Sequence, residues 1–166
     1  AAAIAAEAAE EVGAEPPDME EFAREYTEAL ATREVGSSIG QLRALTNTED
    51  LDDLEEVIIT RAEEWHETRP EKVAANEIVR AATGAERAAW TIAGVTYLVW
   101  RANPDACPIC EEMDGRRVGI QDYFLTPGES VTPSERPGGL VAEHNISGPP
   151  LHQGCECDLS PETRWF

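Results

Sequence analysis

The sequence has few basic residues and no long apolar run. Thirteen Lys and Arg stand against 33 Asp and Glu, so the formal net charge of the 166 residues is -20. No apolar stretch is long enough to cross a bilayer, and the alanine-rich start has no basic residue ahead of it and three glutamates within it, unlike a secretory leader. We therefore expect a soluble protein with no secretory leader and no membrane partner.

The shortage of positive charge also argues against nucleic-acid binding, which depends on Lys and Arg that displace counterions from phosphates. Residues 1–56 carry a net charge of -13, residues 57–104 are neutral, and residues 105–166 carry -7. Arg116 and Arg117 form the one basic cluster. We expect no strong direct binding to DNA. The excess acidic residues could keep the protein solvated or form a docking surface for a basic partner, and we favour solvation.

The apolar pattern predicts an α+β fold, with helices in the N-terminal two-thirds. A first amphipathic helix follows Pro16-Pro17-Asp18 and is expected to break at "GSSIGQ", residues 36–41. A second is expected to begin at Asn47 or Thr48 and to end or kink at Pro70. The predicted apolar stripes comprise Leu51, Leu54, Ile58, Ala62 and Trp65, then Ala74, Ile78, Ala81, Ala85, Ala88 and Ile92.

The C-terminal third has a different pattern. β-branched and aromatic residues predict a strand over 95–103, and "GGLVAEH", 138–144, is the one other plausible strand in the following loop. Asp114-Gly115 predicts a two-residue hairpin turn, in which both central residues need positive φ. The Pro-, Gly- and Ser-rich stretch from 123 to 150 is long enough to need an internal staple.

The four cysteines are paired in sequence, as Cys107-x-x-Cys110 and Cys155-x-Cys157, with His152 just before the second pair. Two disulfides would suit a secreted protein and are less favoured here. Zinc explains the spacing, because a C-x-x-C turn directs two thiolates at one ion and a distant Cys/His cluster completes a tetrahedron. Five donors compete for four places. His152 is slightly favoured over Cys157 as the fourth ligand, and both remain candidates.

A zinc ion with four protein ligands has no open position, so we expect one structural zinc per chain. Its binding would supply much of the folding free energy of the C-terminal segment. We therefore predict an acidic helical extension over 1–46 and a helical region leading into a strand over 47–104. A zinc-binding β and loop unit over 105–158 and a tail over 159–166 follow.

Catalytic patterns are incomplete. The segment beginning at His66 starts like H-E-x-x-H but has Pro70 where the second histidine must stand, and no H-x-E precedes the cysteines as in a deaminase. His144 lies in the loop with no chemical partner in sequence. We therefore expect no enzymatic activity, no catalytic residues and no organic cofactor.

The order of motifs resembles the Mu F-like head-morphogenesis, or minor head protein, family of tailed bacteriophages over roughly residues 60–158. The matching residues are Arg69, Glu71, Ala74, Asn76, Trp100, Cys107, Cys110, Met113 to Gly115, Pro150, His152, Cys155 and Cys157. The family usually ends in Cys-Arg-Cys, whereas this chain has Cys155-Glu156-Cys157.

The resemblance implies a structural virion component that is made in the host cytoplasm and built into the head near the portal. Its expected partners are the portal protein, the major capsid protein, or both. Two alternatives stay open. One is an accessory zinc-containing enzyme or toxin-associated module, and the other is a zinc-ribbon adaptor for nucleic acids.

Overall fold

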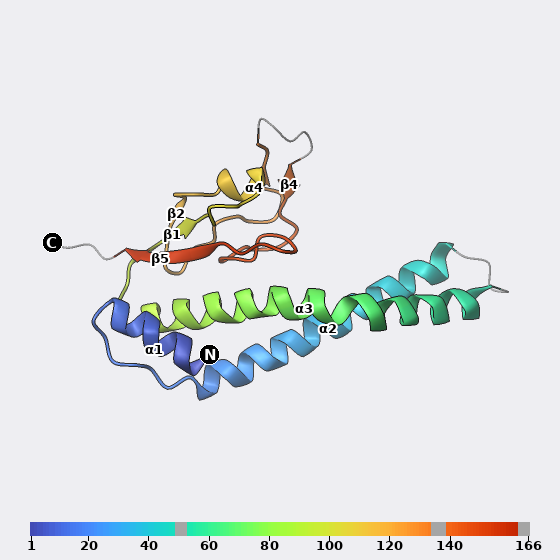
Figure 1. Cartoon of the computed structure of the whole chain (residues 1–166), viewed down its shortest axis with the longest axis horizontal. Helices are drawn as coiled ribbons and strands as arrows, with labels where there is room; N and C mark the ends of the chain where they lie inside the picture. Colours follow the sequence, from blue (N-terminus) through green and yellow to red (C-terminus); the bar gives the residue numbers. More distant parts are fainter. Residues whose placement is uncertain (49–52, 134–138, 163–166) are drawn as a thin grey trace. The chain divides into compact units, whose positions relative to one another are not determined.

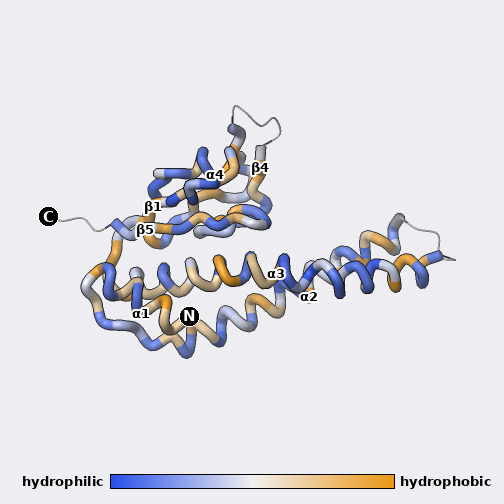
Figure 2. Tube along the Cα trace, viewed as in Figure 1, coloured by the Kyte–Doolittle hydropathy of each residue, from blue (hydrophilic) through white to orange (hydrophobic). Residues whose placement is uncertain are grey.

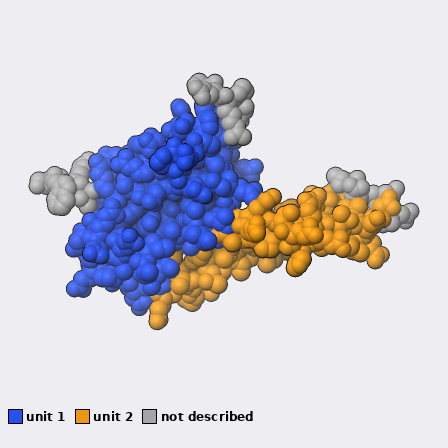
Figure 3. All heavy atoms as spheres, in the orientation of Figure 1, with its two compact units in different colours: residues 1–19, 75–166 blue, residues 20–74 orange. Residues whose placement is uncertain are grey.

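The computed structural model describes residues 1–48, 53–133 and 139–162. Its three long helices precede the strands in the chain, and one short helix follows the first strand, which confirms the predicted α+β class (Figure 1). The chain divides into two compact units, one of residues 1–19 and 75–166 and the other of residues 20–74 (Figure 3). Among the described helices, none has the length and apolar character needed to cross a bilayer.

The unit of residues 20–74 contains α2 (Glu20–Thr48) and the first part of α3 (Leu54–Ile92). The break expected at residues 36–41 does not occur, because α2 runs through it. Each internal glycine costs a helix up to about 1 kcal/mol relative to alanine. Side-chain bonds offset that cost: Ser38 Oγ donates to the Glu34 carbonyl at 2.8 Å, and Arg69 of α3 donates to Ser38 Oγ at 2.9 Å.

Helix α3 begins later than predicted and continues through Pro70. Asn47 and Thr48 belong to the end of α2, and Glu55 and Glu56 occupy the first turn of α3, where carboxylates favour the helix dipole. Pro70 removes one backbone hydrogen bond. The preceding Arg69 bonds to Ser38 and Glu34 of α2, and its guanidinium lies 4.9 Å from the centre of the Trp65 ring. These contacts support the helical turn at Pro70.

The second unit combines α1 (Ala2–Glu11), the α3 residues from 75 onward and the β structure. In α1, Ala5, Ala8 and Ala9 are buried, and the Trp90 indole donates to the Ala8 carbonyl at 3.0 Å. The predicted 1–46 extension is therefore divided, since its first helix packs on α3 within the β-containing unit. The small alanine side chains allow that close packing.

A three-stranded antiparallel sheet has the order β2-β1-β5, formed by β2 (Arg117–Gly119), β1 (Tyr97–Arg101) and β5 (Asp158–Glu162). The alternation of β1 buries Leu98 and Trp100, as a half-covered strand requires. β1 lies within the strand predicted over 95–103. The predicted tail instead supplies β5, with Leu159 opposite Trp100, while residues 163–166 lie outside the described part.

The predicted hairpin at Asp114-Gly115 is wrong. Gly115 has φ 73°, but Asp114 does not have positive φ, and the residues before it form the short helix α4 (Pro108–Glu111). Pro108 at the first helical position, after an extended Cys107, fixes the chain for a helical turn. Strand β2 therefore pairs with β1, and Asp114 Oδ1 accepts a bond from the Ala102 amide at 2.9 Å.

The predicted apolar stripe of α3 is only partly buried. Of the predicted stripe, Ala85 is buried, whereas Ile78 and Ile92 are 70% and 67% exposed. The buried face of α3 consists instead of Thr83, Ala85, Ala89 and Trp90. Apolar and polar residues alternate along the helix (Figure 2). Leu51, from the stripe predicted in the preceding segment, lies outside the described residues.

The long loop between β2 and β5 is held partly by β pairing and partly by α3. Strands β3 (Ser130–Val131) and β4 (Leu140–Val141) pair with each other, and β4 lies within the strand predicted over 138–144. From α3, Arg87 donates to the Ser147 carbonyl at 2.6 Å and to the Asp122 carbonyl at 2.8 Å. Gly148 packs so closely that an added Cβ would lie 2.7 Å from Thr83 Cγ2.

Carboxylates from three elements meet at one place in this unit. Glu86 of α3 lies beside Asp158 of β5 and near Glu11 and Glu7 of α1. Burial, followed by repulsion from Asp158 and Glu11, raises the pKa of Glu86 to about 7. Its Oε2 is buried without a hydrogen-bond partner among the described residues. Ionised Glu86 therefore destabilises the packing of these elements.

Replacement of this carboxyl by an amide is expected to stabilise the unit above neutral pH. Because the folded-state pKa exceeds the usual 4.5, the folded protein binds this proton more tightly, and stability falls as pH rises from 4.5 to about 7. Glu86→Gln should raise the unfolding free energy at pH 8 by about 1 kcal/mol. This is less than the whole rise in the Glu86 pKa would give, because water screens the half-buried carboxylate. The gain should largely vanish at pH 5.

Urea unfolding followed by tryptophan fluorescence at the two pH values measures this difference. Glu143→Gln, which changes an exposed carboxylate of the same unit, is the matched control and should have no effect at either pH. A stabilisation by Glu86→Gln that is equal at pH 5 and pH 8 would contradict the titration of Glu86.

Candidate metal centre

The first pair of cysteines lies on the turn that opens α4. Cys107 is the N-cap residue and Cys110 lies within the helix, where it is buried. Burial tends to raise the pKa of Cys107, but N–H groups of Cys110 and Ile109 and the neighbouring His152 lower it below its usual range. The C-x-x-C turn therefore supplies the amide donors that stabilise a thiolate.

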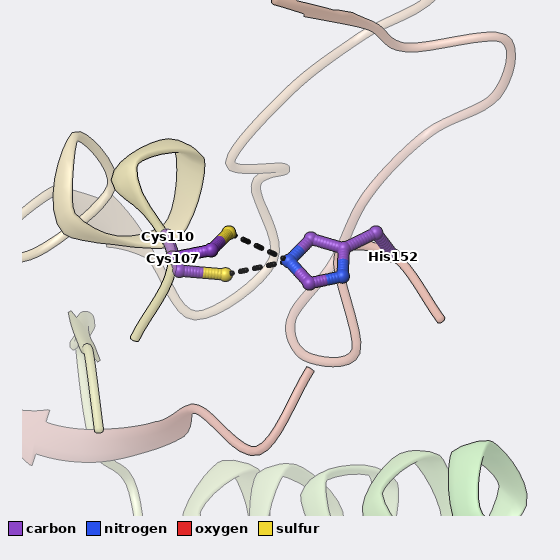
Figure 4. A group of neighbouring side chains, drawn as sticks. All are labelled: Cys107, Cys110 and His152. Atoms are coloured by element: carbon purple, nitrogen blue, oxygen red, sulfur yellow. Dashed lines mark hydrogen bonds between the residues drawn. The ribbon is translucent and has the colours of Figure 1, made fainter. Parts of the chain in front are cut away.

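His152 approaches this turn from the loop before β5. Its Nε2 atom lies 3.1 Å from Cys107 Sγ and 3.1 Å from Cys110 Sγ, so the ring edge faces both sulfurs (Figure 4). Its Nδ1 atom lies 2.9 Å from the Gln153 carbonyl, which can only accept a hydrogen bond. The proton of a neutral ring is thus placed on Nδ1, and the Nε2 lone pair is left for a metal ion.

The turn that carries His152 and Cys155 is fixed at both ends. The Cys155 amide donates to the His152 carbonyl at 3.1 Å, and the Gly154 amide donates to Asn76 Oδ1 of α3 at 3.1 Å. Gly154 has φ 75°, a backbone conformation that glycine adopts readily and that residues with a side chain rarely adopt. Asn76 entered the sequence analysis only as part of a family motif, and the structure gives it this contact.

The second pair of cysteines reaches the same place. Cys110 Sγ and Cys155 Sγ are 3.7 Å apart, well beyond the roughly 2.05 Å of a disulfide, and all four cysteines are free thiols. Two donor groups result, one of Cys107, Cys110 and His152 and one of Cys110, Cys155 and Cys157, each with its atoms within 4.8 Å of one another. Cys110 belongs to both, so all five predicted donors are brought together.

The cluster favours negative charge on sulfur. A hydrogen bond from the Cys110 thiol lowers the pKa of Cys155 to about 5, and the same contact raises the pKa of Cys110. At neutral pH one proton is therefore shared unequally between the two buried sulfurs. An anionic sulfur beside an imidazole lone pair is a donor set suited to a soft or borderline divalent cation.

One donor separation matches that of a tetrahedral zinc ion, and two are shorter. With Zn–S near 2.3 Å and Zn–N near 2.0 Å, tetrahedral ligand atoms lie roughly 3.6 to 3.8 Å apart. The separation of 3.7 Å between the sulfurs of Cys110 and Cys155 matches this value. The contacts of 3.1 Å between His152 and the sulfurs of Cys107 and Cys110 are about 0.5 Å shorter, a difference that small side-chain rotations can supply.

His152 and Cys157 occupy different surroundings. His152 contacts Cys107 and Cys110, whereas Cys157 lies with Cys110 and Cys155. The Asn103 amide donates to the Cys157 sulfur, and the Trp100 indole N–H faces it without reaching hydrogen-bond geometry. Contact with both residues of the C-x-x-C turn favours His152 as the fourth ligand, with Cys157 as a neighbouring thiol.

The remaining histidines lie outside both donor groups. His66 is exposed on the α3 segment of the helical unit, and His144 is exposed in the loop after β4.

Substitution of individual donors should separate ligands from neighbours. Wild-type protein is expected to retain about one zinc per chain, because the two donor groups share Cys110 and so lie at one place. Cys107→Ser, Cys155→Ser and His152→Ala should each lose most of the metal after dialysis against a mild chelator, as each removes a ligand from a closed site. Cys157→Ser should retain it. Elemental analysis by mass spectrometry measures the content.

His144→Ala is the matched control for His152→Ala, since it removes an exposed histidine of the same unit. Loss of zinc from Cys157→Ser together with retention in His152→Ala would instead assign a site of four cysteines. Two disulfides and no metal in the purified protein would contradict the metal centre altogether.

Comparisons with protein-family models, with curated proteins and with solved structures give no match for this chain. A function must therefore be argued from its own residues and their geometry.

Proposed function

We propose that the protein is a structural minor head component of a tailed bacteriophage, of the Mu F-like type, whose β-containing unit is held by one structural zinc. The observation that supports this most is the convergence of the motifs that carry the resemblance. Asn76 of α3 contacts the turn before Cys155, and Cys107, Cys110 and His152 meet beside it. Motifs spread over some 80 residues thus surround one centre.

The proposed zinc acts on structure, because four protein ligands leave no position for water or substrate. Cys107 and Cys110 would bind it from α4, and His152 and Cys155 from the loop before β5. The residue separations of 42 to 45 between these partners mean that the ion closes a long loop. Binding that depends on the folded arrangement contributes its free energy to folding.

The nucleic-acid adaptor is less well supported, because the one basic cluster of the sequence is partly neutralised within the protein. Arg117 forms an ion pair with Glu162, and its guanidinium lies 3.6 Å from the centre of the Tyr97 ring. Counterion release requires cationic groups that are free to meet phosphates. The accessory-enzyme alternative requires an open metal position, which a site with five available donors does not favour.

Complementation in the phage that encodes the chain tests the proposed function. Deletion of the gene should abolish infectious particles, and wild-type protein supplied from a plasmid should restore them. Cys107→Ser should fail, because loss of a ligand unfolds the unit, whereas the control His144→Ala should restore the titre fully.

Mass spectrometry of purified particles should find the chain at low copy number, and heads assembled without it should be defective. Normal particles from the deletion strain, or a genome without portal and large terminase genes beside this one, would contradict the phage assignment.

A further inference from the structure

The helical unit of residues 20–74 carries an apolar groove that the metal centre does not use. The groove lies between α2 and α3 and has a volume of about 470 Å³. Its apolar wall consists of Val35, Ile39 and Leu42 from α2 and Trp65, Pro70 and Val73 from α3, and we call it the hairpin groove. All these residues belong to one compact unit.

The spacing of the wall residues fits a helical occupant. Val35, Ile39 and Leu42 stand at i, i+4 and i+7 on one face of α2, and the wall of α3 spans nine residues, so the groove extends along about two helical turns, roughly 12 Å. Val35 and Ile39 are 57% and 44% exposed. Apolar side chains left exposed along such a groove are typical of surfaces that receive the apolar face of another helix.

The charge of the unit specifies the chemistry of that helix. Residues 20–74 include 15 acidic and 6 basic residues, a net charge of -9. The basic residue that lines the groove, Arg69, is already engaged with Glu34 at 3.5 Å and with Ser38 at 2.9 Å. An incoming helix therefore approaches a unit of net negative charge, and Lys or Arg beside its apolar stripe would be attracted to that unit.

We propose that the hairpin groove binds a basic amphipathic helix of a partner protein. A second copy of this chain fits less well, since each copy brings a further charge of -20. An extended peptide also fits less well, because helix backbones have their hydrogen bonds satisfied and offer no strand edge. The sequence favoured solvation as the role of the acidic excess, and the groove gives part of that charge a second role. This proposal does not depend on the phage assignment or on the metal.

A synthetic peptide tests the surface with the full-length chain. The probe is an 18-residue helix with leucines at three- and four-residue spacing on one face and Lys and Arg on the other. One reference peptide has Glu in place of the basic residues, and another has the basic composition in scrambled order. Fluorescence anisotropy should give a dissociation constant of about 1 to 50 µM for the probe, weaker at higher salt, and at least about tenfold weaker binding for both references.

Two matched variants distinguish the groove from general attraction to an acidic protein. Ile39→Ser removes a groove side chain that is 44% exposed, and Ile59→Ser removes a similarly exposed one, 51%, from the same unit outside the groove wall. Ile39→Ser should weaken binding about fivefold or more, while Ile59→Ser should change it less than about twofold. Circular dichroism verifies that both fold.

Equal effects of the two serine variants, or equal binding of the scrambled peptide, would overturn the proposal. Self-association of the chain that Ile39→Ser abolishes in sedimentation experiments would also overturn it, and would assign the groove to a second copy.

Discussion

The contacts of Cys107 and Cys110 with His152 and Cys155 join two segments that are 42 to 45 residues apart, and the β-containing unit depends on them. Closing a loop of this length costs conformational entropy, which its one short strand pair and one isolated β-bridge offset poorly. A metal ion with ligands on both segments would offset this cost in one step. The closure also places β5 beside β1, so that Leu159 covers the buried Trp100.

Helix α3 supports the same closure by ordinary bonds. Asn76 accepts a hydrogen bond from the Gly154 amide, in the turn between His152 and Cys155. Arg87 donates to the carbonyls of Asp122 and Ser147. Thr83 packs against Gly148. These contacts come from one helix, at positions one to two turns apart, and reach three points of the loop. The turn that carries His152 and Cys155 is therefore held by a helix outside the loop. Such outer contacts orient the side chains that bind a metal ion.

The sequence predicted what depends on local chemistry and missed what depends on distant partners. The pairing of cysteines beside His152 predicted the donors that the structure brings together, because metal ligands need definite residue types at definite spacing. The helix break at residues 36–41 was wrong, since Arg69 of α3 bonds the serines that would otherwise favour a turn.

The hairpin at Asp114-Gly115 was wrong because Pro108 begins a helical turn just before it. Strand β5 was missed because its pairing partner is distant in sequence. Its residues, Asp158 to Glu162, include a proline and two acids, and they form a strand only because β1 lies beside them.

X-ray absorption spectroscopy of the zinc-loaded protein tests the central claim most directly, since it counts the sulfur and nitrogen atoms bound to the ion. The arrangement of Cys107, Cys110, His152 and Cys155 predicts three sulfurs at about 2.3 Å and one nitrogen at about 2.0 Å. Four sulfurs and no nitrogen would assign Cys157 in place of His152. A first shell with water or carboxylate oxygen would contradict a closed structural centre.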